Sequence, residues 1–359
     1  MKYNSVVILA DAGIGDFVWA TSALALIRDY DKDIEIILVT SDKYIDLIDK
    51  RLSINKIVTT NNRYHVSKNK IVRFCYKLFW SVKNFKYFYK KDVCLFLDIS
   101  MFFTITSKYL YGIKNIIGPN NFAFGYNLIN KSAKYYTKQV VMPLDSDRNS
   151  FMMRYQCIVR AVFPTYNLAV PVLPDTNHLS EKIKKIIGTT KKYKIALAPC
   201  ASVTWRSWNI EYLKKLIEVI NKNFEVSFFI FGSSKNEKNY ALSLIDSLPK
   251  DINIKSMVNK TSLLELKEFL KNMDLLISVD TGIIHLAAVM NIPIISLHGA
   301  NLPENSGAIT SKVISLCSYR NCAPCTYKTV LNNFVCKNIK CMQDIKPETV
   351  FEKIKEILN

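Results

Sequence analysis

Three segments of the sequence carry side chains that could do chemistry. The first of these segments ends in a carboxylate. Residues 10–16 read ADAGIGD, so Gly13 and Gly15 precede Asp16 where an apolar strand meets a helical pattern. A dinucleotide-binding fingerprint would need Gly or Ala three residues after Gly15, where Val18 stands. A carboxylate would also repel a pyrophosphate at a helix N-terminus. Two interpretations stay open: Asp16 is an N-cap of the helix, or it is a general base that accepts a proton from a substrate hydroxyl.

The second segment, residues 197–216, combines the features of an anion site. A predicted strand ends in small and hydroxyl residues that include Ser202, and Arg206 lies just before a helix that begins near Asn209. Backbone N–H groups, hydroxyls and a guanidinium can together hold a diphosphate. The alternative is an ordinary connection that carries a surface arginine.

The third segment is the most informative. A buried strand at 275–279 leads directly into Asp280, Thr281 and Gly282, and His285 follows three residues later on the same helical face. Gly282 permits close approach of the backbone to a ligand, and the free N–H groups of the new helix can hold phosphate. Each feature alone has a capping or packing explanation. Their concentration at the carboxyl end of a strand is typical of ligand sites in open α/β sheets.

These segments need strands and helices in alternation to position them, and the apolar pattern predicts that alternation twice. Strands are expected at 6–9, 34–39, 93–97, 195–198, 226–231, 275–279 and 294–297, and helices at 17–30, 210–220, 241–248, 262–270 and 347–358. Continuous apolar runs suit parallel strands that are buried on both faces. A chain of 359 residues is long enough for two cores. We therefore predict an α/β protein with two doubly wound domains that face a central cleft.

The net charge of +19 suggests an anionic partner. Residues 61–91 hold nine Lys or Arg and no Asp or Glu. Apolar residues recur there at helical spacing, namely Ile71, Phe74, Cys75, Leu78, Val82, Phe85 and Phe88. One interpretation is a helix packed on the sheet with a solvated basic face. The other is a surface that touches an anionic membrane or a phosphorylated lipid, and both can hold together.

Five of the nine cysteines fall within residues 317–341, with the spacing C-x4-C-x2-C-x10-C-x4-C. Cys322, Cys325, Cys336 and Cys341 could form a tetrahedral site for zinc or iron. The alternative is reduced, buried cysteine in a loop before the last helix. No apolar run reaches the roughly 18 residues needed to span a bilayer. Asp11 and Asp16 interrupt the apolar stretch at the N-terminus, so we expect no signal peptide and a cytoplasmic protein.

Four stretches, GIGD at 13–16, PCASVTWRSW at 199–208, FGSSKNE at 231–237 and DLLISVDTGIIHLAAVMNIPIISLHG at 274–299, together resemble glycosyltransferase family 9, the ADP-heptose:lipopolysaccharide heptosyltransferases. CAPC and CKNIKCM in the cysteine cluster add to the resemblance. It implies a GT-B fold of two Rossmann-like domains. The expected parts are an acceptor-binding domain at 1–170, a linker at 171–180, a nucleotide-sugar-binding domain with the cysteine cluster at 181–345, and a C-terminal helix at 346–359.

The resemblance also implies roles for individual residues in an inverting, metal-independent transfer. Asp16 matches the catalytic base of the family, in an acceptor loop with Gly13 and Gly15. The residues that match donor-binding positions are Ser202, Arg206, Glu237, Asp280, Thr281, Gly282 and His285. Arg206 stands where the family usually has a lysine that contacts the donor diphosphate, and Ala201 replaces the usual threonine, which removes one phosphate contact. Glu237 matches an acidic position that holds the nucleoside.

The expected function is therefore transfer of a heptose, or a related sugar, from a nucleotide-sugar donor such as ADP-heptose to an anionic glycolipid of the lipopolysaccharide core type. Peripheral contact with the inner face of the membrane would fit such an acceptor. No cofactor is expected for catalysis, and a structural zinc or iron is expected only at the cysteine cluster. The alternatives are a protein acceptor and a GT-B nucleotide-sugar epimerase. A nucleic-acid-binding module ranks last, because no RRM, KH or zinc-finger pattern is present.

Overall fold

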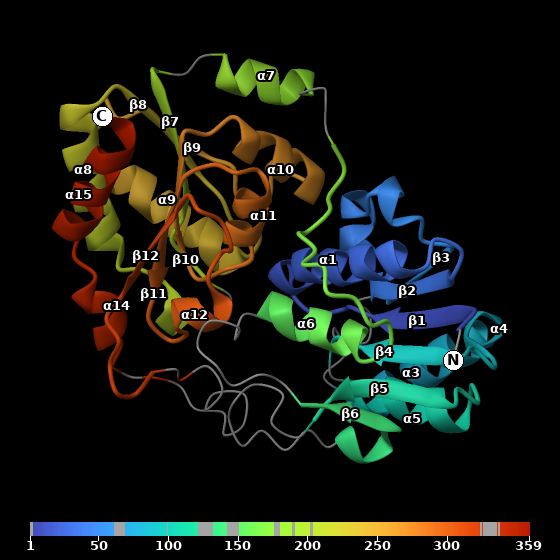
Figure 1. The fold of residues 1–359 in the computed structure, drawn as a ribbon. Helices are drawn as coiled ribbons and strands as arrows, with labels where there is room; N and C mark the ends of the chain where they lie inside the picture. The colour runs from blue at the N-terminus through green and yellow to red at the C-terminus, as the bar shows by residue number, and fades with distance from the viewer. Residues whose placement is uncertain are drawn as a thin grey trace. The chain divides into compact units, whose positions relative to one another are not determined.

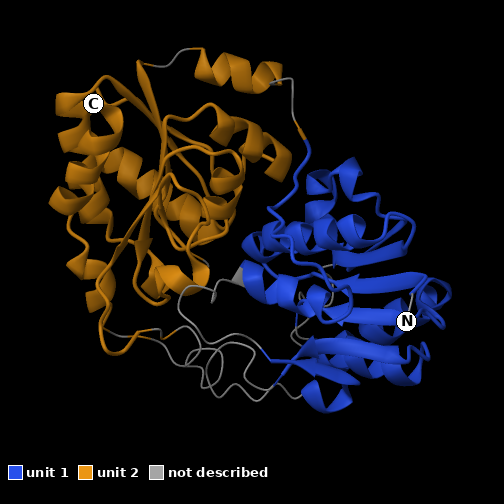
Figure 2. Ribbon diagram, in the orientation of Figure 1, with its two compact units in different colours: residues 1–174 blue, residues 175–359 orange. Residues whose placement is uncertain are grey.

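The computed structural model divides into two compact units, residues 1–174 and 175–359 (Figure 2). It describes residues 3–60, 69–98, 100–120, 132–141, 151–175, 180–188, 191–201, 204–323, 325, 336 and 338–359. Each unit has its own parallel six-stranded sheet. The prediction of an α/β protein with two doubly wound sheets is confirmed.

The sheet of the first unit has the strand order β3-β2-β1-β4-β5-β6, and neighbouring strands are parallel throughout. The strands are β1 (Ser5–Leu9), β2 (Glu35–Ser41), β3 (Lys56–Thr60), β4 (Val93–Phe96), β5 (Asn115–Pro119) and β6 (Lys138–Val140). All residues of β1 and β4 are buried. The carboxyl ends of these two central strands therefore lie side by side, because Leu9 pairs with Phe96 in register.

The helices of the first unit are α1 (Ile14–Tyr30), α3 (Lys70–Lys83), α4 (Phe85–Phe88), α5 (Met101–Tyr109) and α6 (Phe151–Arg160), with 3-10 turns η1 (Asp42–Leu47), η2 (Lys50–Leu52) and η3 (Ala133–Tyr135). α1 begins at residue 14 rather than at the predicted residue 17, so the loop after β1 is shorter than expected. α1 and α6 pack against each other (Figure 1). This packing places α1, near the N-terminus, next to α6, which lies well over a hundred residues further along the chain.

The sheet of the second unit has the order β12-β11-β10-β7-β8-β9, and it is also parallel. Its strands are β7 (Tyr193–Ala198), β8 (Val226–Ile230), β9 (Ile254–Ser256), β10 (Leu275–Val279), β11 (Ile294–His298) and β12 (Val313–Cys317). Its helices are α7 (Glu181–Ile187), η5 (Thr204–Arg206), α8 (Ile210–Asn223), α9 (Lys235–Ser247), α10 (Leu263–Lys271), α11 (Ile283–Val289), α12 (Pro303–Ser306), α14 (Lys340–Asp344) and α15 (Pro347–Leu358). The predicted bounds of β10 and α15 match those observed, and the predicted Ser262–Glu265 capping box starts α10.

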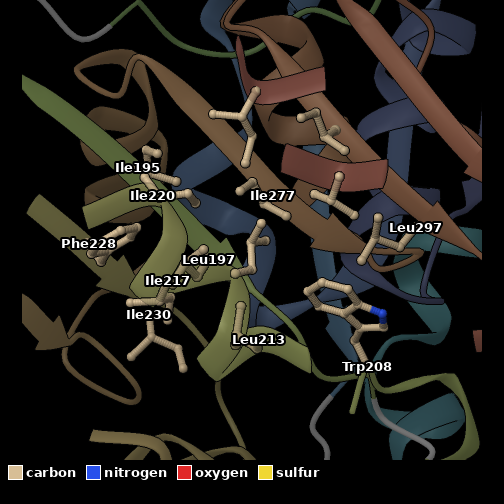
Figure 3. Close-up of a cluster of buried hydrophobic side chains, with 14 of the residues drawn as sticks. Ile195, Leu197, Trp208, Leu213, Ile217, Ile220, Phe228, Ile230, Ile277 and Leu297 are labelled. Atoms are coloured by element: carbon tan, nitrogen blue, oxygen red, sulfur yellow. The ribbon is translucent and has the colours of Figure 1, made fainter. Parts of the chain in front are cut away.

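The core of the second unit lies between the sheet and the helices α8 and α15, which pack on each other. Figure 3 shows Trp208 together with aliphatic side chains from α8 and from the strands β7, β8, β10 and β11. The Trp208 indole N–H donates to the Ile345 carbonyl at 3.1 Å, so the polar end of this buried ring is satisfied. The short connection that carries Arg206 is thereby anchored just before α8.

The helix predicted within residues 67–91 exists, but its apolar stripe does not pack on the sheet as one interpretation required. Of the seven stripe residues, Phe88 is buried and Phe85 is half-buried, while Ile71, Phe74, Cys75, Leu78 and Val82 are exposed. Trp80 contacts the core instead, through Phe88 and Phe103. None of the helices within the described ranges has the length and apolar character needed to cross a bilayer.

Candidate active site

The loop between β1 and α1 holds Asp16 within the first turn of the helix. Gly13 is the N-cap, so Asp16 is the third helical residue and not the cap that one interpretation proposed. Its Oδ2 accepts the backbone N–H of Gly13 at 3.0 Å, as in a capping box. A carboxylate at this position also interacts favourably with the helix dipole. The backbone thus holds one oxygen of the half-buried Asp16.

A second carboxylate lies close to Asp16, and the sequence analysis did not select it. Asp98 follows β4, the parallel neighbour of β1. Its Oδ2 accepts the backbone N–H groups of Asp11 and Ala12, the latter at 2.9 Å. Asp98 therefore fixes the same loop that leads into α1. Its place directly after the strand predicted at 93–97 was the sequence signal that could have found it.

The two carboxylates share one hydroxyl group. Tyr155 on α6 is 6% exposed, and its hydroxyl lies 3.2 Å from Oδ1 of Asp16 and 3.0 Å from Oδ1 of Asp98. No local pattern pointed to Tyr155, because it is 139 residues from Asp16 in the chain. The packing of α6 on α1 supplies this contact.

The electrostatics of this cluster favour proton binding near neutral pH. Desolvation, followed by the charge of Asp16, raises the pKa of Asp98 to about 7. Burial and the two neighbouring carboxylates raise the pKa of Tyr155 well above its ordinary value. Burial likewise raises the pKa of Tyr44, whose hydroxyl donates to the Ala12 carbonyl at 2.8 Å. The pKa of Asp98 thus lies close to physiological pH, where its carboxyl group can exchange a proton.

The structure brings together two residues that were predicted to bind an anion in the second unit. Arg206 at the end of η5 donates through Nη2 to the carbonyl of Asp280 and to its Oδ2, the latter at 2.8 Å. Asn301, in the loop after β11, donates to the same Oδ2 at 2.7 Å. Nε of Arg206 is buried and has no hydrogen-bond partner within the described part of the chain. The guanidinium therefore keeps donor capacity that Asp280 does not use.

Two buried histidines, His285 and His298, lie near this ion pair. Burial alone would raise the pKa of Asp280, but the charge of Arg206 and the contributions of its other neighbours outweigh it and lower that pKa. Burial lowers the pKa of His285 to about 4, and it also lowers the pKa of His298. Both imidazoles are thus neutral at physiological pH, while Asp280 is ionised. This part of the second unit therefore combines one carboxylate, one guanidinium and two neutral histidines.

The remaining predicted donor-binding residues have different environments. Gly282 is the N-cap of α11, and Thr281 precedes it at the end of the β10 connection. Glu237 closes a capping box at α9, where its Oε2 accepts the N–H groups of Ser233 and Ser234 at 2.8 and 2.7 Å. Its charge also contributes to a raised pKa of Cys200, mainly caused by burial, so it lies near the β7–η5 connection. Ser202 lies outside the described residues.

The four cysteines that were predicted as metal ligands share one neighbourhood. Burial, followed by Cys325, raises the pKa of Cys341 to about 11, and Cys322 and Cys336 contribute in the same direction. Cys325 and Cys341 are buried, Cys336 is half-buried and Cys322 is exposed. Within the part of the chain that the structure describes, no three His, Cys, Asp or Glu residues have a metal-binding arrangement. The donor set fits a thiolate-binding metal in composition, since a cation would offset the cost of ionising Cys341.

The cysteine cluster packs on the loop that carries Asn301. The N–H of Cys325 donates to the Ala300 carbonyl at 2.8 Å. A Cβ at Gly299 would lie 2.8 Å from Sγ of Cys341 and 2.6 Å from Sδ of Met342, so only glycine fits there without movement of its neighbours. The end of β11 thus connects the cysteine cluster with the Arg206–Asp280 pair.

A family model described as glycosyltransferase family 9 (heptosyltransferase) matches residues 130–335. Among curated relatives, lipooligosaccharide heptosyltransferase 2 of Campylobacter jejuni is 26% identical over 218 residues, which span 59% of this chain and 66% of the relative. Lipopolysaccharide heptosyltransferase 1 of Campylobacter coli is 24% identical over 365 residues, which span 98% of each chain.

Two solved structures extend the comparison to the fold. The E. coli ADP-heptose LPS heptosyltransferase II superimposes with a TM-score of 0.72 at 13% identity, covering 99% of this chain and 98% of that one. The iron-containing dodecameric glycosyltransferase TibC of enterotoxigenic E. coli gives a TM-score of 0.59 at 14% identity, covering 99% and 76%. Likeness at this level of identity concerns the fold, and it confirms the predicted GT-B class of two Rossmann-like domains.

Proposed function

Because this chain belongs to glycosyltransferase family 9, we propose that it transfers a heptose, or a related sugar, from ADP-heptose to a lipopolysaccharide core-type acceptor. It is a glycosyltransferase, and relatives over part or all of its length carry the name heptosyltransferase. The acceptor would bind to the first unit and the nucleotide-sugar to the second. The position of Asp16, a half-buried carboxylate in the first turn of the helix that follows the central strand β1, is the observation that carries the proposal.

Asp16 would act as the general base of an inverting transfer. It removes the proton of the acceptor hydroxyl as the oxygen attacks the anomeric carbon from the face opposite the nucleoside diphosphate. A positioned general base contributes about 10²–10⁴ in rate. The backbone N–H of Gly13 and the hydroxyl of Tyr155 support this role, because both restrict the orientation of the carboxylate. Gly13 and Gly15 keep the adjacent loop small beside the acceptor.

Arg206 would contact the leaving diphosphate of the donor. The guanidinium is already oriented by Asp280 and has an unused Nε–H, so it can bind an oxyanion without losing its partner. Asp280, Thr281, Gly282 and His285 line the same connection, and Glu237 and Ser202 complete the proposed donor site by their match to the family pattern. Positive charge and N–H dipoles here stabilise the charge that develops on the departing phosphate, with no divalent ion in the proposed step.

Replacement of the base tests the proposed function directly. We expect Asp16→Asn to lower the release of ADP from ADP-heptose, measured with a lipopolysaccharide acceptor, by about 10²–10⁴-fold. Donor affinity, measured by calorimetry with ADP, should be retained because Asp16 belongs to the first unit. Asp29→Asn, an exposed change at the other end of α1, is the matched control. Near-normal turnover of Asp16→Asn would exclude this residue as the base.

We also propose that the exposed face of α3 contacts an anionic membrane. This face is defined by Ile71, Val72, Tyr76, Leu78, Phe79 and Val82, all exposed. Lys70, Lys83 and Lys86 flank it, and residues 69–91 contain no acid. Apolar side chains bordered by lysines match a bilayer surface with anionic headgroups. Such contact would keep the enzyme next to a membrane-embedded glycolipid.

The cysteine cluster is proposed to hold one structural zinc or iron. Cys322, Cys325, Cys336 and Cys341 supply four thiols, and the first three contribute to the raised pKa of Cys341. An iron-containing glycosyltransferase shares the fold, which favours iron as the first metal to test. The metal would stabilise the loop that contains Gly299 and Ala300, which the cysteine cluster contacts. It would take no part in the transfer itself.

A further inference from the structure

The hydroxyl of Tyr155 has more acceptors within reach than it has protons. It lies 3.0 Å from one carboxylate and 3.2 Å from the other, and it carries a single hydrogen. If both Asp16 and Asp98 were ionised, the phenol could donate to only one of them, and the other carboxylate would face a lone pair. A second proton removes this conflict, because a protonated Asp98 donates to the Tyr155 oxygen and Tyr155 then donates to Asp16.

Resting on the proposed role of Asp16 as base, we propose that Asp98 and Tyr155 are positioning residues that form a proton-holding chain, Asp98 to Tyr155 to Asp16. Asp98 holds a proton and turns the hydroxyl of Tyr155 toward Asp16. Asp16 is then the only negative charge of the three, and its orientation is fixed from two sides, by Gly13 and by Tyr155.

The other contacts of Asp98 agree with this arrangement. Its Oδ2 accepts two backbone N–H groups, from Asp11 and Ala12, so the proton belongs on Oδ1, the oxygen that faces Tyr155. A carboxylic acid arranged in this way satisfies both of its oxygens. An asparagine side chain can reproduce every one of these bonds, since its carbonyl accepts and its amide donates.

The charged and titratable groups around Asp98 come from each element that packs on it. Asp16 on α1 and Tyr155 on α6 are the nearest, Asp11 lies in the loop after β1, and Tyr44 on η1 faces the same acids. Desolvation opposes ionisation of Asp98, and the charge of Asp16 opposes it further, which raises its pKa to about 7. Asp98 therefore gains a negative charge as the pH rises through this value. Ionised Asp98 then competes with Asp16 for the proton of Tyr155.

Two substitutions of Asp98 separate proton holding from simple structural support. At pH 6 we expect Asp98→Ala to lower kcat at least tenfold, and Asp98→Asn to recover most of that loss because the amide imitates the protonated acid. The ratio of wild-type kcat to Asp98→Asn kcat should fall as the pH rises from 6 to 8.5, because only the wild-type loses the orienting hydrogen bond. A flat ratio, or an asparagine variant as impaired as the alanine variant at pH 6, would overturn the proposal.

Tyr155→Phe tests the proton-holding chain in a variant that keeps Asp98. We expect about tenfold lower kcat with unchanged affinity for ADP, whereas Tyr109→Phe, an exposed change on α5, should have no effect. Full activity of Tyr155→Phe with a wild-type pH profile would also overturn the proposal. Asp16→Asn distinguishes the two levels of failure: if that variant remains active, the proposed base is wrong, and if it is inactive while the Asp98 and Tyr155 results fail, only the proton chain is wrong.

Discussion

The side chains of Arg206 and Asp280 are largely buried, with exposures of 19% and 8%. Each therefore compensates the charge of the other at a site that water reaches poorly. Removal of one partner from such a pair leaves an uncompensated charge, which typically costs about 3–5 kcal/mol in deep sites. The lowered pKa of Asp280 means that this stabilisation is present above the ordinary aspartate range and is lost as the pH falls through the lower, folded-state value.

Arg206→Met should therefore reduce both stability and donor binding. We expect a loss of about 2 kcal/mol in the free energy of unfolding, less than in fully buried pairs because Arg206 keeps some exposure, and an at least tenfold weaker Kd for ADP. The double variant Arg206→Met, Asp280→Asn should recover much of the stability but none of the affinity. Urea denaturation and calorimetry measure the two effects. Unchanged ADP affinity in the single variant would remove Arg206 from the donor site.

At the scale of elements, α3 differs from the other long helices of the described residues in that most of its apolar side chains are exposed. Ile71 and Phe79 keep 72% and 67% of their surface, while large residues of α1 and α8 are buried in the cores. Exposed apolar patches of this kind normally mark an interaction surface. The basic residues between them favour an anionic partner over a neutral one.

The triple variant Ile71→Ser, Phe79→Ser, Val82→Ser should bind vesicles of phosphatidylglycerol and phosphatidylcholine at least tenfold more weakly than the wild-type chain. Wild-type binding should also weaken as the salt concentration rises. Cosedimentation measures both. Leu168→Ser with Val170→Ser changes equally exposed residues outside α3 and is the matched control. Binding of the triple variant at the wild-type level would contradict the membrane role.

The elements themselves could largely be predicted from the sequence, because strands such as β10 and helices such as α15 follow directly from apolar period and capping residues. The face of α3 could not, since periodicity identifies an amphipathic helix but not what covers it. The contacts that join Asp98 and Tyr155 to Asp16 depend on β1 pairing with β4 and on α6 packing against α1, and these long-range contacts leave no trace in a local window. The segment from Asp280 to His285 could be selected from the sequence because its residues lie close together in the chain, and its role in donor binding stays a prediction.

For the whole molecule, each unit has its own sheet and core, and the cysteine cluster belongs to the second. If the cluster holds a metal, purified protein should contain close to one equivalent of iron or zinc per chain, measured by plasma emission spectrometry. Cys322→Ser with Cys325→Ser should abolish this content and lower the melting temperature, because metal binding contributes to folding. Cys75→Ser, an exposed cysteine on α3, is the control. A metal content near zero in the wild-type protein would exclude the site.

Gly299 gives this cluster a consequence for sequence divergence. Its missing side chain is the space that Cys341 and Met342 occupy, although more than forty residues separate them in the chain. We therefore expect positions 299, 341 and 342 to change together among relatives. A larger residue at 299 is tolerated only where the side chains at 341 and 342 become smaller or move. A chimera that exchanges the C-terminal segment between relatives must also exchange the end of β11. Otherwise the side chains at 341 and 342 will not pack against residue 299.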